Sequence, residues 1–193
     1  MRDLEVPDAV RERVREAMQA TDRAAFLPRV VRHLAGVDRP VGIGWDATNS
    51  QPSTVARMLE LLDARPGHRV LDVGAGSGWT TAILAELGAE TTGVELVPEL
   101  VAFANANLAE HGSPARVRRA TPGVLGLPDD GPWDRILVSA DFGRMPDALV
   151  AQLAERGRMV APVAGLMLVV DVHRGVPRVR QDGGRYAFVP LIG

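Results

Sequence analysis

The sequence predicts an α/β fold in which a doubly wound, mostly parallel sheet has helices on both faces and an antiparallel hairpin at its C-terminal edge. Three observations lead to this prediction. Short apolar runs alternate with segments of helical periodicity between residues 53 and 162, as in successive β-α-β units. A glycine-rich turn directly follows the buried-strand pattern at 70–73. The last two apolar runs are separated by glycines and not by a helix.

The first third of the chain is expected to form two helices joined by irregular segments. Apolar residues at helical spacing predict a helix over 7–20, with Pro7 in its first turn. The region 26–40 is expected to be irregular or short helical, and the Gly-rich, polar stretch 41–52 is expected to be a loop. A second helix is expected to begin at 52 or 53 and to end at 62.

Strands and helices alternate through the rest of the chain. The expected helices are 79–87, 98–110 and 146–154. The expected strands are 69–73, 91–95, 115–119, 134–139, 157–162, 166–172 and 186–191. Only Gly175 and the pair Gly183-Gly184 punctuate the stretch between the last two strands, so these strands are expected to pair as an antiparallel hairpin.

Length and charge indicate one domain, expected to span residues 1–193, that binds neither nucleic acid nor membrane. A chain of 193 residues can bury one sizeable core, and a net charge of −2 gives no sign of a surface for polyanions. The N-terminus is charged and no apolar run reaches membrane-spanning length. A cytoplasmic protein is therefore expected.

Residue content excludes several kinds of chemistry. The chain has no cysteine, which excludes a thiolate nucleophile, a disulfide and a cysteine zinc site. All 22 basic residues are arginine, which excludes a lysine nucleophile or Schiff base. The four histidines are far apart in the sequence, so no metal site is expected.

The glycine-rich turn predicts a cofactor that contains a nucleoside. Closely spaced glycines at a strand-to-helix turn let a ligand approach bare backbone. Glu95 ends the next strand about twenty residues later, where a carboxylate can bind the hydroxyls of a ribose. The alternatives are a purely structural turn, an exposed strand end at Glu95, and an Asp72 that caps the turn through its N–H groups. The expected cofactor-binding residues are Asp72, Gly74, Ala75, Gly76, Ser77, Gly78, Glu95 and Leu96.

The spacing of these glycines narrows the choice among cofactors that contain a nucleoside. The dinucleotide fingerprint places its third glycine three positions after the second, whereas here Gly78 follows Gly76 by two. No lysine is present for a phosphate-binding loop. The form D-x-G-x-G-x-G instead resembles motif I of the class I methyltransferases that use S-adenosyl-L-methionine (SAM).

Further stretches resemble one methyltransferase family. They are Arg23-Ala24-Ala25-Phe26-Leu27-Pro28, Ile43-Gly44 with Thr48-Asn49-Ser50-Gln51-Pro52, the region 134–163, and Phe188-Val189-Pro190-Leu191. From about Val6 to the C-terminus, the chain is similar to the protein-L-isoaspartate (D-aspartate) O-methyltransferase family. The S-Q-P loop and the F-V-P-L ending are the parts that point to this family.

The resemblance implies a Rossmann-like core and a defined reaction. It implies SAM as cofactor, and isoaspartyl-containing proteins or peptides as substrates whose carboxyl group is methylated to initiate repair. Residues 1–62 would form a helical and substrate-loop region, and 63–193 the cofactor-binding core. A carboxylate is already ionised at neutral pH, so the transfer needs orientation and partial desolvation but no general base.

The S-Q-P loop supplies the uncharged donors that such a substrate needs. With the resemblance, Ser50 is expected to orient the substrate carboxylate, and Thr48, Asn49 and Gln51 are expected to contact the substrate. The alternative is structural: Asn49 and Ser50 would only cap the helix that begins at Pro52.

The chain departs from the family pattern in three places. Pro122 replaces the acidic residue of a G-D-G motif, Ala47 replaces a glutamine, and a longer loop is cut to Ala164-Gly165. These departures keep two alternatives open. One is a peptide-tailoring aspartyl O-methyltransferase, and the other is a catalytically silent SAM-fold binding protein. The sequence leaves the oligomeric state open, with a monomer as one option.

Overall fold

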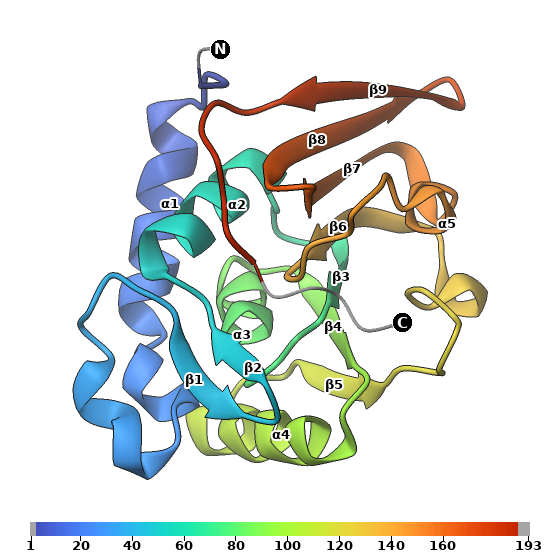
Figure 1. Cartoon of the computed structure of the whole chain (residues 1–193). Coiled ribbons are helices and arrows are strands. Elements are labelled where there is room, and N and C mark those ends of the chain that lie inside the picture. The colour runs from blue at the N-terminus through green and yellow to red at the C-terminus, as the bar shows by residue number, and fades with distance from the viewer. Residues whose placement is uncertain (1–2, 189–193) are drawn as a thin grey trace.

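The computed structural model describes residues 3–188 and contains one seven-stranded sheet with the order β5-β4-β3-β6-β7-β8-β9 (Figure 1). The first five of these strands pair in parallel, and β8 and β9 continue the sheet in antiparallel fashion. The predicted mostly parallel sheet with antiparallel C-terminal strands is confirmed. Its strands are β3 (Arg69–Val73), β4 (Glu90–Glu95), β5 (Arg116–Arg119), β6 (Trp133–Val138), β7 (Leu153–Val163), β8 (Leu166–His173) and β9 (Val176–Gln181).

Four of the five expected helices form close to their predicted bounds. They are α1 (Asp8–Ala20), α2 (Pro52–Leu62), α3 (Trp79–Glu86) and α4 (Pro98–His111). Single 3-10 turns occur at Arg23–Phe26, Arg29–Leu34 and Pro128–Asp130. No helix within residues 3–188 is both long and apolar enough to cross a membrane.

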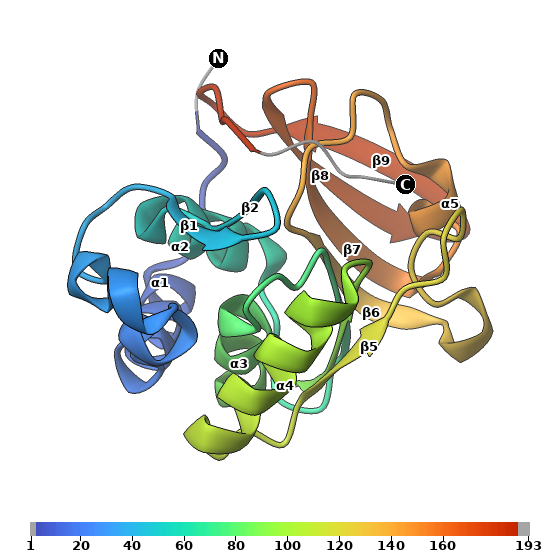
Figure 2. The same ribbon diagram turned by 60° about the horizontal axis from the view of Figure 1, so that its bottom comes forward.

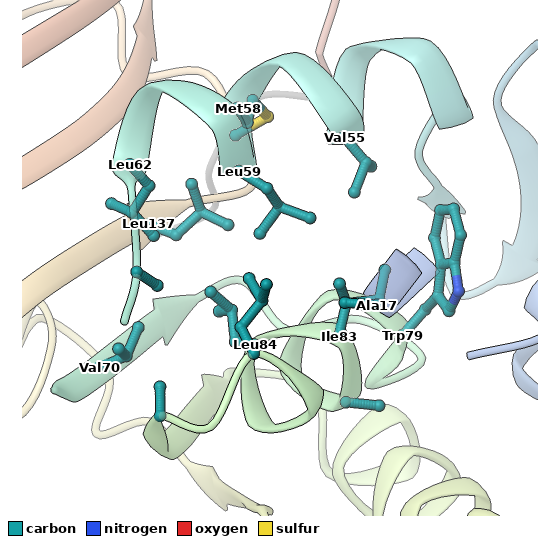
Figure 3. Packing of buried hydrophobic residues seen from close by; sticks show 14 of the residues in the cluster. Ala17, Val55, Met58, Leu59, Leu62, Val70, Trp79, Ile83, Leu84 and Leu137 are labelled. Carbon is teal, nitrogen blue, oxygen red and sulfur yellow. The ribbon is translucent and has the colours of Figure 1, made fainter. Parts of the chain in front are cut away.

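The larger part of the core lies between the sheet and helices α1 to α4 (Figure 2). Side chains alternate along each strand, so Val70 and Leu137 point to this face. Figure 3 shows the apolar side of α2, with Leu59 and Met58, above Ile83 of α3. Burial of such side chains stabilises the fold by roughly 1.5–3 kcal/mol each.

The opposite face of the sheet has a thinner cover. Leu71 and Ile136 point to this face and pack with Leu149 of the short helix α5 (Asp147–Val150). The connection that runs from 120 to 132 covers the rest without an α-helix. This connection therefore lies beside the ends of β3 and β6, where it can form part of a site.

Helix α5 is much shorter than the predicted helix over 146–154, and that prediction was wrong in its length. The chain enters β7 at Leu153, which pairs with Trp133 of β6. The Gln152 carbonyl accepts a hydrogen bond from the Trp133 N–H at 2.8 Å. Ladder pairing with β6 therefore overrides the helix propensity of this stretch.

The C-terminal hairpin was predicted with the wrong partner strand. β8 pairs with β9, and the chain reverses at Arg174 and Gly175, both with positive φ. Every residue of β9 except the last is exposed, so the strand lacks the apolar alternation that signals a buried face. Residues 186–188 form no strand, and 189–191 of the expected strand lie outside the described residues.

The expected loop over 41–52 contains a small two-stranded sheet, β1 (Val41–Gly44) and β2 (Ala47–Asn49). Trp45 and Asp46 form its tight turn, with φ of 51° and 56°. Turns of this kind favour glycine or asparagine, so Trp45-Asp46 gave no sequence signal for a hairpin.

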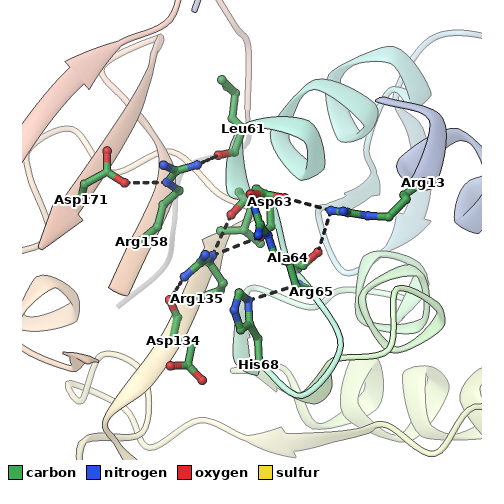
Figure 4. Close-up of polar contacts among 11 residues, drawn as sticks. Arg13, Leu61, Asp63, Ala64, Arg65, His68, Asp134, Arg135, Arg158 and Asp171 are labelled. Atoms are coloured by element: carbon green, nitrogen blue, oxygen red, sulfur yellow. Dashed lines mark hydrogen bonds and ion pairs between the residues drawn. The ribbon is translucent and has the colours of Figure 1, made fainter. Parts of the chain in front are cut away.

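Charged side chains anchor the C-terminal end of α2 to the sheet (Figure 4). Arg135 of β6 donates from Nε to the Leu62 carbonyl at 2.9 Å, and Arg158 of β7 donates from Nη1 to the Leu61 carbonyl at 3.0 Å. Cations favour the exposed carbonyls of a helix C-terminus. The opposite end of α2 is thereby held near the edge where the parallel strands end.

Candidate active site

Two adjoining pockets open at the edge where the parallel strands end. The first, called the apolar pocket, has a volume of about 470 Å³. Its wall comes from the β1–β2 turn, the glycine-rich turn after β3, the residues after β4, the segment 120–126 and the end of β6. The predicted cofactor residues that line it are Gly74, Gly76, Glu95 and Leu96.

The second pocket, called the polar pocket, has a volume of about 550 Å³. It is lined by the N-terminal half of α2, the residues just before that helix and the segment 185–188. Three predicted substrate residues line it, namely Thr48, Ser50 and Gln51. Thr48 and Ser139 line both pockets, so the two pockets meet there.

The glycine-rich turn brings bare backbone to the apolar pocket. Gly76 has a φ of +55°, a left-handed conformation that branched side chains resist. A Cβ at this position would come within 3.5 Å of Ile43 Cδ1. Gly78 does not line the pocket, because it faces Ala104 and lets α3 pack closely against α4.

Glu95 holds the glycine-rich turn and the start of the next segment together. Its Oε2 accepts a hydrogen bond from the Gly76 N–H at 3.0 Å. Its Oε1 accepts from the N–H groups of Leu96 at 2.7 Å and Val97 at 3.1 Å. A carboxylate offers about four acceptor positions, so one more donor can bind to Glu95 at the pocket wall.

Asp72 is fully buried and lines neither pocket. Its two oxygens accept hydrogen bonds from Thr81 Oγ1 at 2.7 Å and Ser139 Oγ at 3.2 Å. The alternative in which Asp72 caps the turn through N–H groups is wrong, because its oxygens accept from these two hydroxyl groups and the Gly76 N–H donates to Glu95. Burial raises the pKa of Asp72 to about 6, although the two hydroxyl donors act in the opposite direction.

Asn49 and Ser77 face each other in the interior rather than the pockets. Asn49 is 4% exposed, and its Nδ2 donates to Ser77 Oγ at 3.0 Å. Its Oδ1 accepts from Arg23 Nε at 2.7 Å. Ala75 is also buried and lines neither pocket. The structure therefore gives these three predicted site residues no direct exposure to either pocket.

Arg23 is the residue around which the loop before α2 is built. It is 5% exposed, and its guanidinium donates to the carbonyls of Ala35, Val37, Arg39, Asn49 and Ser50. Burial lowers its pKa, and the charge of Asp38 acts in the opposite direction. The sequence placed Arg23 only within a family-like segment, with no indication of this role.

Helix α2 is capped by Asp38 and not by the residues that precede it. Asp38 Oδ1 accepts from the Ser53 N–H at 2.9 Å, and Asp38 Oδ2 accepts from Gln51 Nε2 at 3.1 Å. The N-cap position is Gln51, whose side chain makes no capping bond. The structural alternative for Asn49 and Ser50 is therefore wrong, and Ser50 lines the polar pocket.

Comparison with known proteins identifies the family. The model of the protein-L-isoaspartate (D-aspartate) O-methyltransferase family matches residues 5–193. The chain belongs to this family. It is 45% identical to the protein-L-isoaspartate O-methyltransferase of Methanopyrus kandleri, over 94% of this chain and 84% of that protein. It is 50% identical to that of Anaeromyxobacter dehalogenans, over 93% and 88%.

Solved structures confirm the fold of this family member. A candidate protein-L-isoaspartate O-methyltransferase from Plasmodium falciparum, solved in complex with S-adenosyl-L-homocysteine, superposes with a TM-score of 0.79. It is 22% identical, and the match covers 98% of this chain and 99% of that one. The alignment supports the methyltransferase fold that was predicted from motif I and the alternation of strands and helices.

Several pocket residues of this family member were missed by sequence reasoning. Trp45 and Asp46 reach the apolar pocket through an unpredicted hairpin. The segment 120–126 lines the same pocket, and the only sequence signal there was a departure from the family motif. Ser139 is the last residue of the strand predicted over 134–139 and directly follows β6, so its place at the sheet edge was available as a signal. Within residues 3–188, no three His, Asp or Glu residues cluster as metal ligands would.

Proposed function

We propose that this chain transfers a methyl group from SAM to the carboxyl group of L-isoaspartyl and D-aspartyl residues in damaged proteins, which initiates their repair. The family match over nearly the whole chain supports the reaction. The observation that carries the proposal is that Thr48 and Ser139 line both pockets. A cofactor in one pocket and a substrate in the other would meet at these two residues.

The apolar pocket fits a cofactor that contains a nucleoside. Its volume falls within the range of about 300–1,000 Å³ that is typical of small-molecule sites. Gly76 leaves space that a side chain would fill, and Glu95 has an acceptor position for a ribose hydroxyl. Val97 and Leu100 add an apolar wall. No acidic side chain stands at Pro122, so the segment 120–126 would hold the base through backbone groups and apolar contact.

The polar pocket provides what a carboxylate nucleophile requires. The cofactor supplies an electrophilic methyl group on a sulfonium and leaves as a neutral thioether. The substrate carboxylate is ionised at neutral pH, so this chain need not provide a general base. Ser50 and Thr48 offer hydroxyl donors that hold the carboxylate, and Ser139 is held by its bond to Asp72 at the junction. The histidines of residues 3–188 do not line the polar pocket.

The proposed partners are isoaspartyl proteins or peptides, and a single chain is the proposed working unit. Each named role in the proposed reaction falls to a residue of this chain, so the proposal requires no residue from a second copy. Sedimentation with and without S-adenosyl-L-homocysteine tests this part of the proposal. An active dimer that loses activity on dissociation would contradict it.

The decisive experiment is methyl transfer to paired peptides that differ only in an isoaspartyl or an aspartyl residue. The extra backbone methylene moves the carboxyl group, and one site cannot hold both positions in line with the methyl group. The isoaspartyl peptide is expected to react far faster. Equal rates, or activity on a single aspartyl peptide alone, would overturn the repair function and favour peptide tailoring. Binding of SAM without any methyl transfer would favour the alternative of a catalytically silent SAM-fold binding protein.

A further inference from the structure

Two arginines line the polar pocket, and the charge of one of them is balanced by an ion pair with a carboxylate. Arg57 donates from Nε to Asp182 Oδ2 at 2.8 Å and from Nη2 to Asp182 Oδ1 at 2.5 Å. It also pairs with Glu60 at 3.4 Å and donates to the Leu4 carbonyl at 2.7 Å. Asp182 is fully buried, and this pairing lowers its pKa against the opposing effect of burial. Arg57 therefore stabilises the fold, and its charge is compensated by carboxylates of the protein rather than available to a ligand.

The second guanidinium belongs to Arg185, whose side chain is exposed at the pocket wall. Among the ion pairs formed by residues 3–188, none includes Arg185. The pocket lining contains no aspartate or glutamate. Tyr186 beside it stays neutral, because burial and Asp182 raise its pKa to about 12. Among the described residues that line the polar pocket, Arg185 is therefore the charged side chain that forms no ion pair with a carboxylate.

The backbone around Arg185 is fixed from both sides. The Asp182 N–H donates to the Met167 carbonyl at 2.9 Å, and the Tyr186 N–H donates to the Gly165 carbonyl at 3.0 Å. The Tyr186 hydroxyl also donates to Asp182 Oδ2 at 3.0 Å. A cation on an anchored segment loses less freedom when it binds a ligand than one on a free loop. The arginine is therefore presented to the pocket by the fold itself.

We propose that Arg185 is a specificity-determining residue that selects substrates with a carboxylate side chain next to the isoaspartyl residue, an inference that rests on the proposed function. The reacting carboxylate must come to the junction at Thr48 and Ser139. Arg185 lines only the polar pocket and is exposed, so it suits a second carboxylate farther out along the substrate. A repair substrate with a neighbouring glutamate or aspartate would supply that group.

The test uses isoaspartyl peptides that are identical apart from one Gln→Glu exchange, made in turn at the two positions before and the two after the isoaspartyl residue. Methyl transfer is measured for the full chain with saturating SAM. At one or more positions glutamate is expected to lower KM about two- to fivefold, the range of an exposed ion pair. Raising the ionic strength should shrink the ratio, because salt screens exposed charges.

Charge reversal at Arg185 gives the sharper comparison. Arg185→Ala should remove the preference for glutamate, and Arg185→Glu should invert it. Arg178→Glu is the matched control, since Arg178 is exposed on neighbouring β9 and lines neither pocket. The Arg178→Glu variant should keep the preference for peptides that contain glutamate.

The outcomes separate this inference from the function on which it rests. A wild-type enzyme that methylates all the isoaspartyl peptides with equal KM overturns the role of Arg185 and leaves the function standing. A preference that survives Arg185→Glu, or one that appears in kcat instead of KM, also overturns it. Failure to methylate any isoaspartyl peptide overturns the function and this inference together.

Discussion

Asn49 donates a hydrogen bond from its Nδ2 to the hydroxyl oxygen of Ser77 at 3.0 Å, and this bond joins the loop before α2 to the glycine-rich turn. The same amide accepts from Arg23 Nε at 2.7 Å. The two walls that meet at the proposed site are thus linked through a buried side chain. Asn49 is buried and contacts neither pocket, so it can affect the site only through Arg23 and Ser77. The next residue, Ser50, lines the polar pocket.

Asn49→Ala is expected to lower the free energy of unfolding by about 2–3 kcal/mol, because it leaves the buried Arg23 Nε and Ser77 Oγ without their partner. Urea denaturation measures this. Gln19→Ala removes an amide from the exposed surface of α1 and serves as the control. Equal stability of Asn49→Ala and the control would show that the bond contributes nothing.

Glu95→Ala is expected to weaken SAM binding by about ten- to a hundredfold, which corresponds to a charge-assisted contact of roughly 1.5–3 kcal/mol. The loss has two sources, the acceptor for the ribose and the anchor of the Gly76 N–H. Calorimetric titration measures the affinity. Glu90→Ala, at the exposed start of the same strand, should bind SAM as the wild type does. Unchanged affinity in Glu95→Ala would place the ligand elsewhere.

The parts of the site that could be predicted from the sequence depend on local backbone requirements. Gly76 must adopt a positive φ beside the apolar pocket, and Glu95 must end the strand adjacent to β3 in a parallel sheet. Both requirements act within one β-α-β unit, so spacing along the chain reveals them. The same holds for α1 and α2, whose apolar residues recur at helical spacing.

The parts that could not be predicted depend on contacts between distant segments. Asn49 and Ser77 are 28 residues apart, and their types alone suggested solvent or ligand contact. Asp182 accepts a hydrogen bond from the Leu4 N–H, 178 residues away in the sequence, and no local sequence pattern predicts this contact. The edge strand β9 has no buried face, so no apolar alternation marks it. In each of these cases the structure is determined by contacts between segments that lie far apart in the sequence.

Ser50→Ala is expected to lower the single-turnover rate by about 10²–10³ if the hydroxyl acts in the transition state. SAM affinity should be almost unchanged, because Ser50 lines only the polar pocket. Stability should change by less than about 0.5 kcal/mol, since α2 is capped by Asp38. Asp38→Ala is the complementary variant and should cost about 0.5–2 kcal/mol of stability. A stability loss in Ser50→Ala without a rate effect would contradict the assignment.

Asp72 gives the stability of the protein a defined dependence on pH. Its pKa is raised from 3.8 to about 6 in the folded state. Well below the unfolded value of 3.8 the carboxyl group is protonated in both states and adds no pH dependence. Between these values the unfolded chain releases the proton first, so the free energy of unfolding falls as pH rises. The total loss by pH 7 is about 3 kcal/mol, at roughly 1.4 kcal/mol per unit.

Asp72→Asn removes this dependence, because an amide does not titrate. The stability of the wild type minus that of the variant should therefore fall by about 2.4 kcal/mol between pH 4 and pH 7. Urea denaturation at four pH values measures the difference, and Asp129→Asn corrects for the loss of one exposed carboxylate. Parallel stability curves for wild type and Asp72→Asn would mean that the buried carboxyl group is ionised at little cost. Ser139 and Thr81 would then compensate its burial fully, and Asp72 would hold the junction of the two pockets as an anion throughout this range.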